Sequence, residues 1–385
     1  MRVDKSKWEK VRLIDVAPIC PSSENSANSV VWLLNLDMIE SQTGKIIRKQ
    51  YCDKKDIGTS VIQFTNRHVL WSKLRPYLNK VVLPDENGYA TSELIPLQPN
   101  RIKRKYLFHL LMSKWFVAQM VASAEGARMP RASMKEFRKL TIALPSDNEQ
   151  RAIAEELDGI QSMIGKFREQ LEDYDRLARS IFHEMFGDPV KNDMGWEMKS
   201  LIEIVGKDCP ISYGIVQAGD EVQNGIPIVR PVDLTSTFVK REGLKLVSPE
   251  ISESYKRTVL KGGEILMCVR GTTGIVSIAS DELKGCNVTR GIAPLRFESS
   301  NKWFMLYCIK TPQIKAIIQE YTKGATLKQI NMADLRKLVF PIPPLPLQQQ
   351  FATRIEAIEA MKEATKAQLA DLQQLFDSRM QYYFS

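Results

Sequence analysis

The sequence has few residues suited to metal or disulfide chemistry. It contains six cysteines and three histidines among 385 residues, and no two cysteines are spaced as Cys-x-x-Cys. We therefore expect neither a zinc site nor a disulfide framework. Reduced thiols, as in a cytoplasmic protein, are the simpler interpretation of scattered cysteines. The cysteines are Cys20, Cys52, Cys209, Cys268, Cys286 and Cys308.

Long apolar runs are also missing. The opening residues, Met1 to Lys5, lack the apolar stretch of a signal peptide. No segment approaches the roughly 18 apolar residues that a membrane span needs. We expect a soluble cytoplasmic protein that makes no contact with a membrane.

Signatures of catalysis are absent as well. The sequence has no GxxxxGK[ST] phosphate loop, no GxGxxG, no HExxH, no GxSxG and no Asn/Asp-Pro-Pro-aromatic run of an amino-methyltransferase. His68, His109 and His183 are isolated, which favours structural roles. Asp281-Glu282 with Lys284 resembles part of a nuclease site, but it falls in a polar turn, where such triplets are common by chance. These absences favour a binding protein that contains no catalytic residues and binds no metal or cofactor.

The charge balance points to a polyanionic partner. The net charge is +9 with a pI of about 9.1, while 44% of the residues are hydrophobic. Lys and Arg near phosphates release condensed counterions, so nucleic acid is a natural partner; an ordinary basic surface is the alternative. A chain of this length is expected to form two or three domains.

The sequence repeats itself once. The segment Trp8–Val16 reappears as Trp196–Ile204, and Met134–Leu140 reappears as Met332–Leu338. The offset between the copies grows from the first match to the second, which places insertions in the interior of the second half, where the copies look unalike. Two repeated units, each about half of the chain, indicate pseudo-twofold symmetry, whereas a solenoid would repeat many short units. Further matches are Pro145 with Pro343, Gln150 with Gln348, and Ala154 with Ala352.

Each copy divides into a mixed segment and a long helix. We expect the first mixed domain over 1–146 and the second over 188–346, with long helices over 147–187 and 347–385. Strands are predicted within Gly262–Val269 and Gly274–Ala279, and single closing helices over Tyr106–Val121 and Trp303–Gln319.

The long helices show a heptad seam. Two duplicated seams favour an intramolecular antiparallel pair, although pairing with another chain is the alternative. The second seam is weaker at Lys362 and Thr365. The seam residues, which would also support partner binding, are Ile153, Leu157, Ile160, Ile164, Phe167, Leu171, Tyr174, Ala178, Ile181 and Met185 in the first helix, and Phe351, Ile355, Ile358, Leu369, Leu372, Phe376 and Tyr383 in the second.

Cationic clusters in loops are the candidates for DNA contact. Arginine grips guanine in a bidentate way, whereas lysine mostly positions the phosphate backbone. A solvated face is the alternative for each residue, and Gln329 and Asn331 either read bases or cap a turn. Leu74-Arg75 is expected to be equivalent to Val269-Arg270. The candidates are Lys73, Arg75, Arg104, Arg128 and Arg131 in the first half, and Arg230, Arg241, Arg257, Arg270, Arg290, Lys323 and Lys328 in the second.

Over nearly its full length the chain resembles the specificity subunit of type I restriction–modification enzymes. The resemblance rests on the Trp-Glu units at Trp8 and Trp196, the turn Gly324–Thr326, the lead-in Pro343–Gln350, and Phe186–Pro189 at the crossover. It implies an α+β fold with two pseudo-twofold-related target-recognition domains separated by two long antiparallel helices in a coiled coil.

The resemblance also implies function. Each domain would read one part of a split, asymmetric site on double-stranded DNA, and the helices would dock two methyltransferase subunits, with a restriction motor-nuclease subunit completing a bacterial defence complex. S-adenosylmethionine, ATP and Mg²⁺ would bind only in those partners. The first half departs from the pattern at Arg128–Arg131 and at Ser146–Asn148. The alternatives are a coiled-coil DNA-binding scaffold and a nuclease or methyltransferase with unrecognised motifs.

Overall fold

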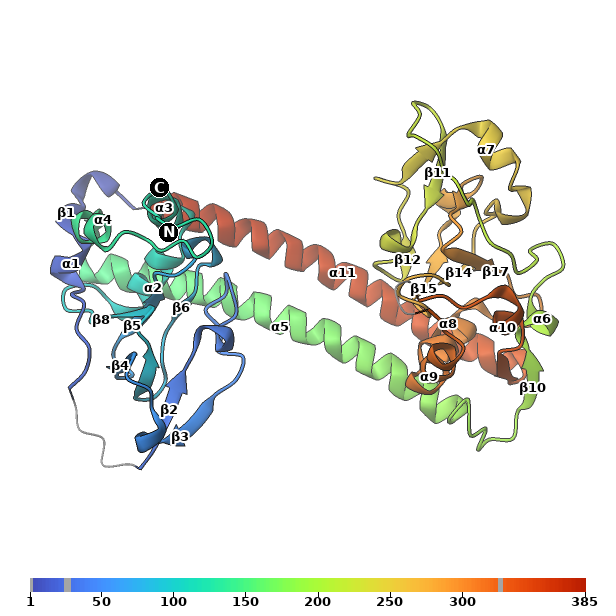
Figure 1. The fold of residues 1–385 in the computed structure, drawn as a ribbon, viewed down its shortest axis with the longest axis horizontal. Helices are drawn as coiled ribbons and strands as arrows, with labels where there is room; N and C mark the ends of the chain where they lie inside the picture. The colour runs from blue at the N-terminus through green and yellow to red at the C-terminus, as the bar shows by residue number, and fades with distance from the viewer. Residues whose placement is uncertain (1–2, 24–28, 325–327) are drawn as a thin grey trace. The chain divides into compact units, whose positions relative to one another are not determined.

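The computed structural model describes residues 3–23, 29–324 and 328–385. The chain forms two compact units, which we call unit 1 (Met1–Glu169 with Lys366–Ser385) and unit 2 (Gln170–Thr365). Each unit therefore combines one mixed α/β domain with parts of both long helices (Figure 1). The ends of the described chain lie together in unit 1, where Val3 N–H donates to the Tyr382 hydroxyl over 3.2 Å.

The helices divide between the two domains and the two long segments. In chain order, the helices of the first domain and the first long helix are α1 (Leu13–Val16), α2 (Arg104–Met112), α3 (Lys114–Ala122), α4 (Met134–Lys139) and α5 (Asp147–Phe186). Those of the second domain and the second long helix are α6 (Leu201–Ile204), α7 (Pro249–Glu253), α8 (Lys302–Lys310), α9 (Pro312–Glu320), α10 (Met332–Arg336) and α11 (Leu345–Phe384). Short 3-10 turns are η1 (Lys5–Lys7), η2 (Leu36–Met38), η3 (Lys54–Asp56), η4 (Pro76–Leu78), η5 (Pro231–Asp233), η6 (Lys256–Thr258) and η7 (Asp281–Leu283).

The strands are short and divide evenly. Unit 1 contains β1 (Glu9–Arg12), β2 (Val30–Leu34), β3 (Gln50–Asp53), β4 (Val61–Phe64), β5 (Val69–Ser72), β6 (Val81–Val82), β7 (Gly88–Thr91), β8 (Leu94–Leu97) and β9 (Thr141–Leu144). Unit 2 contains β10 (Glu197–Ser200), β11 (Ile226–Val229), β12 (Phe238–Val239), β13 (Lys245–Val247), β14 (Ile265–Cys268), β15 (Val276–Ala279), β16 (Asn287–Val288), β17 (Ile292–Leu295) and β18 (Val339–Ile342).

The two domains share their strand pairing even where their sequences diverge. The antiparallel order β6-β5-β8 in unit 1 corresponds to β15-β14-β17 in unit 2. The mixed order β3-β2-β7 corresponds to β13-β11-β16, with one antiparallel and one parallel pairing in each. The interiors, which look unalike in sequence, therefore share this strand pairing, because backbone pairing tolerates large changes of side chain. The copies differ in their extra strands: β4 joins β7 in unit 1, and β12 joins β15 in unit 2.

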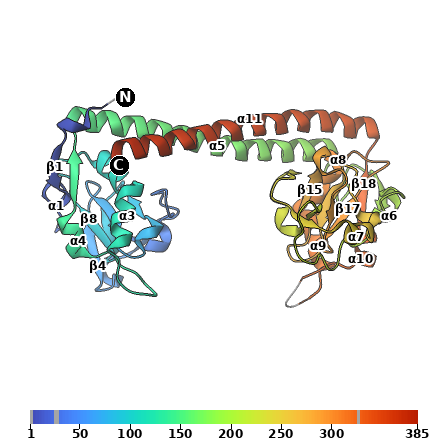
Figure 2. The ribbon, with the colours of Figure 1, turned by 90° about the horizontal axis from the view of Figure 1, so that it is seen from above.

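The repeated frame closes each domain in the same way. Strand β1 pairs antiparallel with β9, and β10 pairs antiparallel with β18. Leu13 N–H donates to the Leu140 carbonyl over 2.8 Å, and Leu201 N–H donates to the Leu338 carbonyl over 2.7 Å. Figure 2 shows β1 and α1 beside α4. The first and last segments of each domain are thus fastened to each other.

The closing helices are broken, which corrects the prediction of one helix over Tyr106–Val121 and one over Trp303–Gln319. Unit 1 has α2 and α3 with an extended residue, Ser113, between them, and unit 2 has α8 and α9 with Thr311 between them. The Ser113 hydroxyl accepts from Phe116 N–H over 3.2 Å, and the Thr311 hydroxyl accepts from Ile314 N–H over 3.4 Å. These side chains cap the second helix of each pair, and the apolar period continues across the break.

Helices α5 and α11 each contain 40 residues. Helix α11 begins at Leu345, two residues before the expected boundary, because Pro346 is tolerated in the first turn of a helix. In unit 2 Asp175 meets Lys362 and Phe182 packs on Phe351, so the two helices run antiparallel there. The final turns of α5 bury Phe182 and Phe186, whereas Ile181 and Met185, expected at the seam, are half-buried.

The other seam residues divide by burial. Ile153, Leu157, Ile160, Ile164 and Ala178 are buried on α5, as are Phe351, Ile355, Ile358 and Tyr383 on α11. Phe167, Leu171, Tyr174, Leu369, Leu372 and Phe376 are half-buried. Among the described residues, no helix is both long and apolar enough to cross a membrane.

A buried glutamine anchors the start of each long helix. In unit 1 the Gln150 carbonyl oxygen accepts from Lys103 N–H over 2.7 Å, and its amide donates to the Pro145 carbonyl over 2.9 Å. In unit 2 Gln348 accepts from Asn301 N–H over 2.7 Å and donates to the Pro343 carbonyl over 2.7 Å. Each amide therefore joins the lead-in of a long helix to the loop before α2 or α8.

Replacing Gln348 with Leu should destabilise unit 2. The change leaves the Asn301 N–H and the Pro343 carbonyl without their partner, and each unsatisfied buried group costs about 1–3 kcal/mol. Urea unfolding of the full chain measures the free-energy change. The exposed Gln350→Leu variant, one half-turn further along the same helix, is the control and should change little. An equal effect of the two substitutions would contradict the anchoring role.

The stability of unit 1 should depend on pH through Glu156. Burial opposes its charge, but hydrogen bonds from Arg379 and from Tyr383 (2.7 Å) outweigh burial and lower its pKa from near 4.5 to about 2. A carboxylate with a depressed pKa stabilises the fold above its unfolded pKa and loses that contribution as pH falls through the folded value. Between pH 4.5 and 2, unfolding of Arg379→Met should therefore depend less steeply on pH than unfolding of the wild type.

Thermal unfolding followed by circular dichroism across that range measures the difference. Arg176→Met is the matched control, because within the described residues Arg176 pairs only with exposed acids of its own helix, Glu172 and Asp173. Parallel pH profiles for wild type and Arg379→Met would show that the interhelical pair contributes nothing.

Candidate nucleic-acid interface

In unit 1 two loops bring the predicted cations together. The loop from β5 to β6 carries Lys73 and Arg75, and the hairpin after α3 carries Arg128 and Arg131. Arg75 N–H donates to the Pro130 carbonyl over 2.7 Å, and Leu74 bridges to Arg131. The hairpin itself is closed by backbone bonds between Glu125 and Arg131 of 2.9 and 3.0 Å. Backbone geometry therefore fixes this pair of loops whatever their side chains.

Unit 2 repeats the arrangement with other residues. Gly271 N–H donates to the Lys328 carbonyl over 2.8 Å, Arg270 bridges to Gln329, and Lys323 and Gln329 exchange backbone bonds of 2.8 Å. The described part of the hairpin stops at Gly324 and resumes at Lys328, so the expected turn at Ala325 and Thr326 lies outside the described residues.

These bonds correct the expected equivalence of Arg75 with Arg270. The strand registers place Leu70 opposite Pro96 and Leu266 opposite Pro294, so the copies align with Leu74 at Arg270 and Arg75 at Gly271. Both Arg75 and Gly271 have positive φ, 48° and 90°. The apolar runs look alike in either alignment, and only the backbone pairing distinguishes them.

Six of the twelve predicted cations are engaged within the chain. Arg104 is half-buried, donates to the carbonyls of His68 and Pro84, and has a pKa lowered by burial. It supports the domain core and opens α2, so it does not lie on the two loops. The other five are Lys73 and Arg131, both paired with Glu93; Arg230, paired with Asp233; Arg241, which donates to the Glu282 carbonyl; and Lys323, which lies 3.8 Å from Asp334.

The remaining six cations form no ion pair with a carboxylate in the described parts of the chain. They are Arg75, Arg128, Arg257, Arg270, Arg290 and Lys328. The chain segments that carry Arg230, Arg270 and Arg290 lie close together, because a β-carbon added at Gly291 would meet Pro231 and lie 3.9 Å from the Arg270 β-carbon. Arg257 lies apart on η6, in the connection from β13 to β14. Asn331 caps α10 by accepting from Asp334 N–H over 2.8 Å, which accounts for that side chain without DNA.

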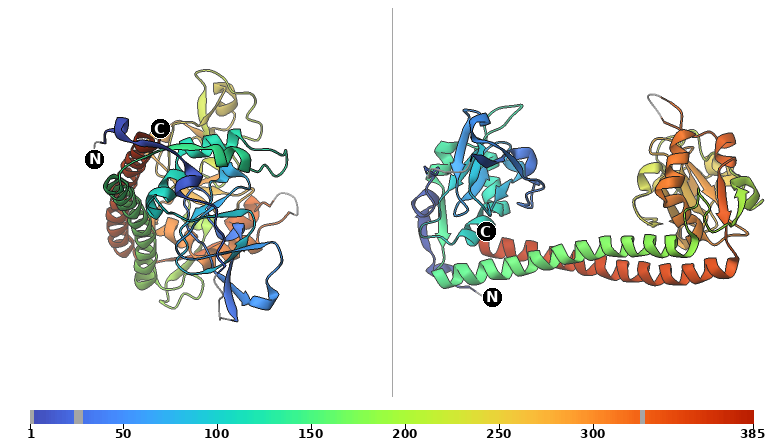
Figure 3. Two further views of the ribbon diagram at one scale, coloured as in Figure 1. Left: turned by 90° about the vertical axis from the view of Figure 1, so that its left-hand side faces the viewer. Right: turned by 90° about the horizontal axis from the view of Figure 1, so that it is seen from below.

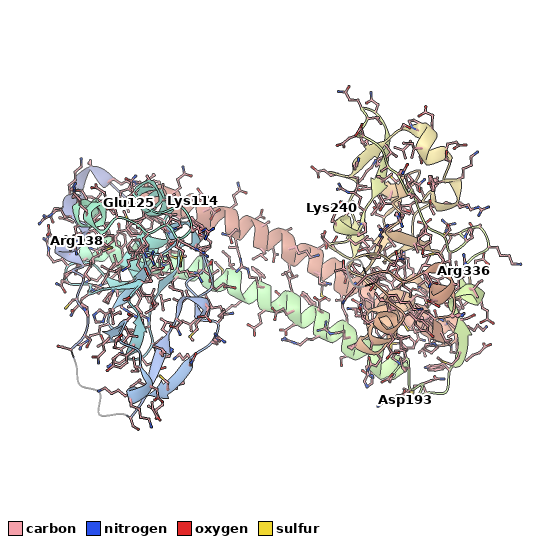
Figure 4. All side chains as sticks on the ribbon, viewed as in Figure 1. Lys114, Glu125, Arg138, Asp193, Lys240 and Arg336 are labelled. Carbon is pink, nitrogen blue, oxygen red and sulfur yellow. The ribbon has the colours of Figure 1, made fainter. Side chains whose placement is uncertain are left out.

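Each unit also has a hollow at the break between its paired helices. The unit 1 hollow, about 620 Å³, is bordered by Ser113, Phe376 and Asp377. Lys114, which is labelled in Figure 4, lies 3.7 Å from Asp377. The unit 2 hollow, about 440 Å³, is bordered by Thr311, Arg179 and Phe182. The two caps, Ser113 and Thr311, are matched by the repeat, so the hollows are the same place in the two copies.

Buried polar groups beside the hollows differ between the copies. In unit 1 His109 Nε2 lies 2.7 Å from Asp158. In unit 2 Tyr307 occupies the matching place; its pKa is raised, first by burial and then by the nearby Glu359.

His68 in turn bonds the Cys20 carbonyl over 2.8 Å, so two of the three histidines, His68 and His109, have structural partners. Asp281 and Glu282 lie on the exposed turn η7, and no group of three metal-ligating side chains occurs in the described ranges.

Comparison with known proteins identifies relatives of both halves. The family model for the type I restriction modification DNA specificity domain matches residues 5–172 and 194–374. The EcoBI specificity subunit of Escherichia coli is 21% identical over 300 residues, covering 71% of this chain and 63% of that protein. The putative MjaX specificity subunit of Methanocaldococcus jannaschii is 25% identical over 286 residues, covering 70% and 65%. The chain thus aligns with slightly less than two thirds of these relatives' length.

Solved structures share the fold. A chain from a study of complex assembly and conformational transition of the type I R-M system has a TM-score of 0.60 at 21% identity, covering 98% of this chain and 97% of that one. The S subunit of the type I system from M. genitalium has a TM-score of 0.58 at 15% identity, covering 99% and 97%. The expected class of two mixed domains with long helices is confirmed. Because the family model matches both halves, the chain belongs to the type I restriction modification DNA specificity domain family.

Proposed function

We propose that this chain is the DNA-recognition subunit of a type I restriction–modification system and has no catalytic centre of its own. Each domain reads one part of a split, asymmetric DNA site, over 1–146 for the first and 188–346 for the second. The helical segments 147–187 and 347–385 join the domains. The relatives named above are specificity subunits, which supports this assignment.

One observation carries the proposal. The two units share their strand pairing and loop anchoring, yet the paired loops present different side chains: Arg75, Arg128 and Met129 in unit 1, and Arg270, Lys323 and Lys328 in unit 2. Two domains with the same strand pairing but different loop side chains are suited to recognise two different base sequences from the same orientation on DNA. Unpaired arginines on these loops have the donors to grip guanine, and the lysines can position phosphates.

The partners follow from the same duplication. Two matching hollows beside the long helices favour two copies of one partner, which we assign to methyltransferase subunits. Half-buried seam residues such as Leu171 and Leu372 offer further apolar surface to them. The methyltransferase subunits would supply S-adenosylmethionine and flip the target base. A restriction subunit, using ATP and Mg²⁺, would complete the cleaving complex.

Mapping of methylated adenines across the genome, with and without this gene, tests the proposal. We expect a split, asymmetric motif that disappears on deletion and returns when the gene is restored. Persistence of the motif would refute the assignment. Methyl transfer from labelled S-adenosylmethionine to DNA by the purified chain alone would contradict the absence of a catalytic centre.

Replacing Arg270 with Ala should weaken recognition of one half-site. If its guanidinium contacts a base, affinity falls by about 1–3 kcal/mol for DNA carrying that half-site. Fluorescence anisotropy of the assembled complex, with each half-site scrambled in turn, measures this loss. Arg241→Ala is the matched control in the same unit, since that guanidinium is occupied by the Glu282 carbonyl over 3.0 Å. A loss spread evenly over unrelated sequences would make Arg270 a phosphate contact instead.

A further inference from the structure

Unit 2 has a small basic hollow that the sequence did not reveal. It measures about 290 Å³ and is lined by the loop Gly271–Ile275, by Lys315 and Gln319 of α9, and by Lys328. Among the described residues that line it there is no Asp or Glu. The loop lies at the junction of the predicted strands Gly262–Val269 and Gly274–Ala279, and Lys315 is not one of the predicted DNA-contacting cations.

The charge in this hollow is not neutralised. Lys315 and Lys328 are both exposed, and within the described ranges neither forms an ion pair with a carboxylate. They come from different elements, α9 and the end of the hairpin, on either side of the glycine-containing loop. Two unpaired ammonium groups around one small space attract an anion.

The loop is held in place before any ligand arrives. Gly271 N–H donates to the Lys328 carbonyl over 2.8 Å. The Gln319 amide donates to the Thr273 carbonyl over 3.1 Å, and the hydroxyls of Thr273 and Thr322 lie 2.9 Å apart. These bonds join the three elements that line the hollow, so binding need not order them first.

The backbone at Gly271 is open to close approach. Its φ is +90°, which favours glycine, and a β-carbon added there would meet no atom within 4 Å. The Gly271 N–H is already bonded to the Lys328 carbonyl, so the glycine contributes open space rather than a donor. That space beside two lysines suits the compact, multiply charged oxygens of a phosphate. A planar base edge would require side-chain donors in fixed directions instead.

The matching place in unit 1 has neither the glycine nor the lysine that line the hollow in unit 2. Arg75 stands where unit 2 has Gly271, followed by Pro76 and the exposed Tyr77, and Pro130 stands where unit 2 has Lys328. The hollow thus belongs to the divergent loops rather than to the shared frame. Its loop lining distinguishes it from the two matching hollows assigned to the methyltransferase subunits, although Lys315 borders both this hollow and the unit 2 hollow.

We propose that this hollow binds a backbone phosphate of the DNA next to the bases read by unit 2. The inference rests on the proposed function and names how one half-site is positioned. Arg270 precedes the loop directly, so a phosphate held here would lie beside the arginine expected to face the bases. Lys315, Lys328 and the Gly271–Ile275 loop are positioning groups that carry no sequence information of their own.

The test measures salt dependence of DNA binding by the complex of the full chain with its methyltransferase subunits. Lys328→Gln should lower the slope of log affinity against log salt by about one, equally for cognate and scrambled DNA. Lys302→Gln, at an exposed lysine opening α8 in the same unit, removes the same charge and should leave the slope unchanged. Lys315→Gln should lower the slope by the same amount. Because Lys315 also borders the unit 2 hollow assigned to a methyltransferase subunit, the complex of this variant is first checked for bound methyltransferase.

The outcomes separate the possibilities. An unchanged slope in Lys328→Gln, with folding verified by circular dichroism, overturns the inference. A loss confined to the cognate half-site also overturns it, because it would indicate a base contact. Inorganic phosphate could raise the melting temperature of the wild type more than chloride does at equal ionic strength. If Lys328→Gln loses this effect while the slope of its DNA binding stays unchanged, the hollow is a site for a free anion instead. Equal binding of cognate and scrambled DNA by the wild type would refute the proposed function. The salt slopes of wild type and Lys328→Gln would still show whether the hollow binds a backbone phosphate.

Discussion

The buried amides of Gln150 and Gln348 are the constraint on which each unit depends. Each uses both ends of one side chain to satisfy two backbone groups, one in the lead-in of a long helix and one in the loop before α2 or α8. Buried backbone groups must be paired, so the point at which each long helix leaves its domain is fixed by hydrogen bonds and not only by apolar packing. Apolar contacts alone would tolerate sliding, since they have little directional preference.

With the frame fixed in this way, the rest of each domain can vary. Strands β2, β3 and β7 of unit 1 pair as β11, β13 and β16 do in unit 2, although their side chains differ. The loops that carry the unpaired cations are attached by main-chain bonds, Arg75 to Pro130 and Gly271 to Lys328. Substitution of their side chains therefore leaves the attachment intact. Figure 3 shows the ribbon of each domain from two further sides. The division between backbone anchoring and exposed side chains allows two domains with the same strand pairing to present different side chains.

The sequence revealed features that repeat and missed features that depend on a partner in space. The duplication and the heptad period predicted both long helices to within two residues of their starts, because periodic burial leaves a periodic sequence. Ser113 and Thr311 were missed as helix breaks, since the apolar period continues through them. In sequence Arg104 resembles its exposed neighbours, because its carbonyl acceptors come from other segments of the chain. Lys315 resembles any solvated lysine on an amphipathic helix. Charge patterns do not reveal which cations are already paired.

The helix seam itself breaks the symmetry of the repeat. Ile164 is buried in unit 1, whereas Lys362, at the matching place, is buried in unit 2 with Nζ 2.8 Å from both Asp175 and Glu359. Burial disfavours the ammonium, but the two carboxylates outweigh it and raise its pKa. A buried ion pair adds little net stability, whereas breaking it leaves a buried charge without a partner and destabilises the fold by about 3–5 kcal/mol. Sliding α11 by one turn along α5 would part Lys362 from Asp175 but not from Glu359, which lies on α11 itself, so only part of that cost applies. The polar position still favours the observed register over the others that an aliphatic seam would accept.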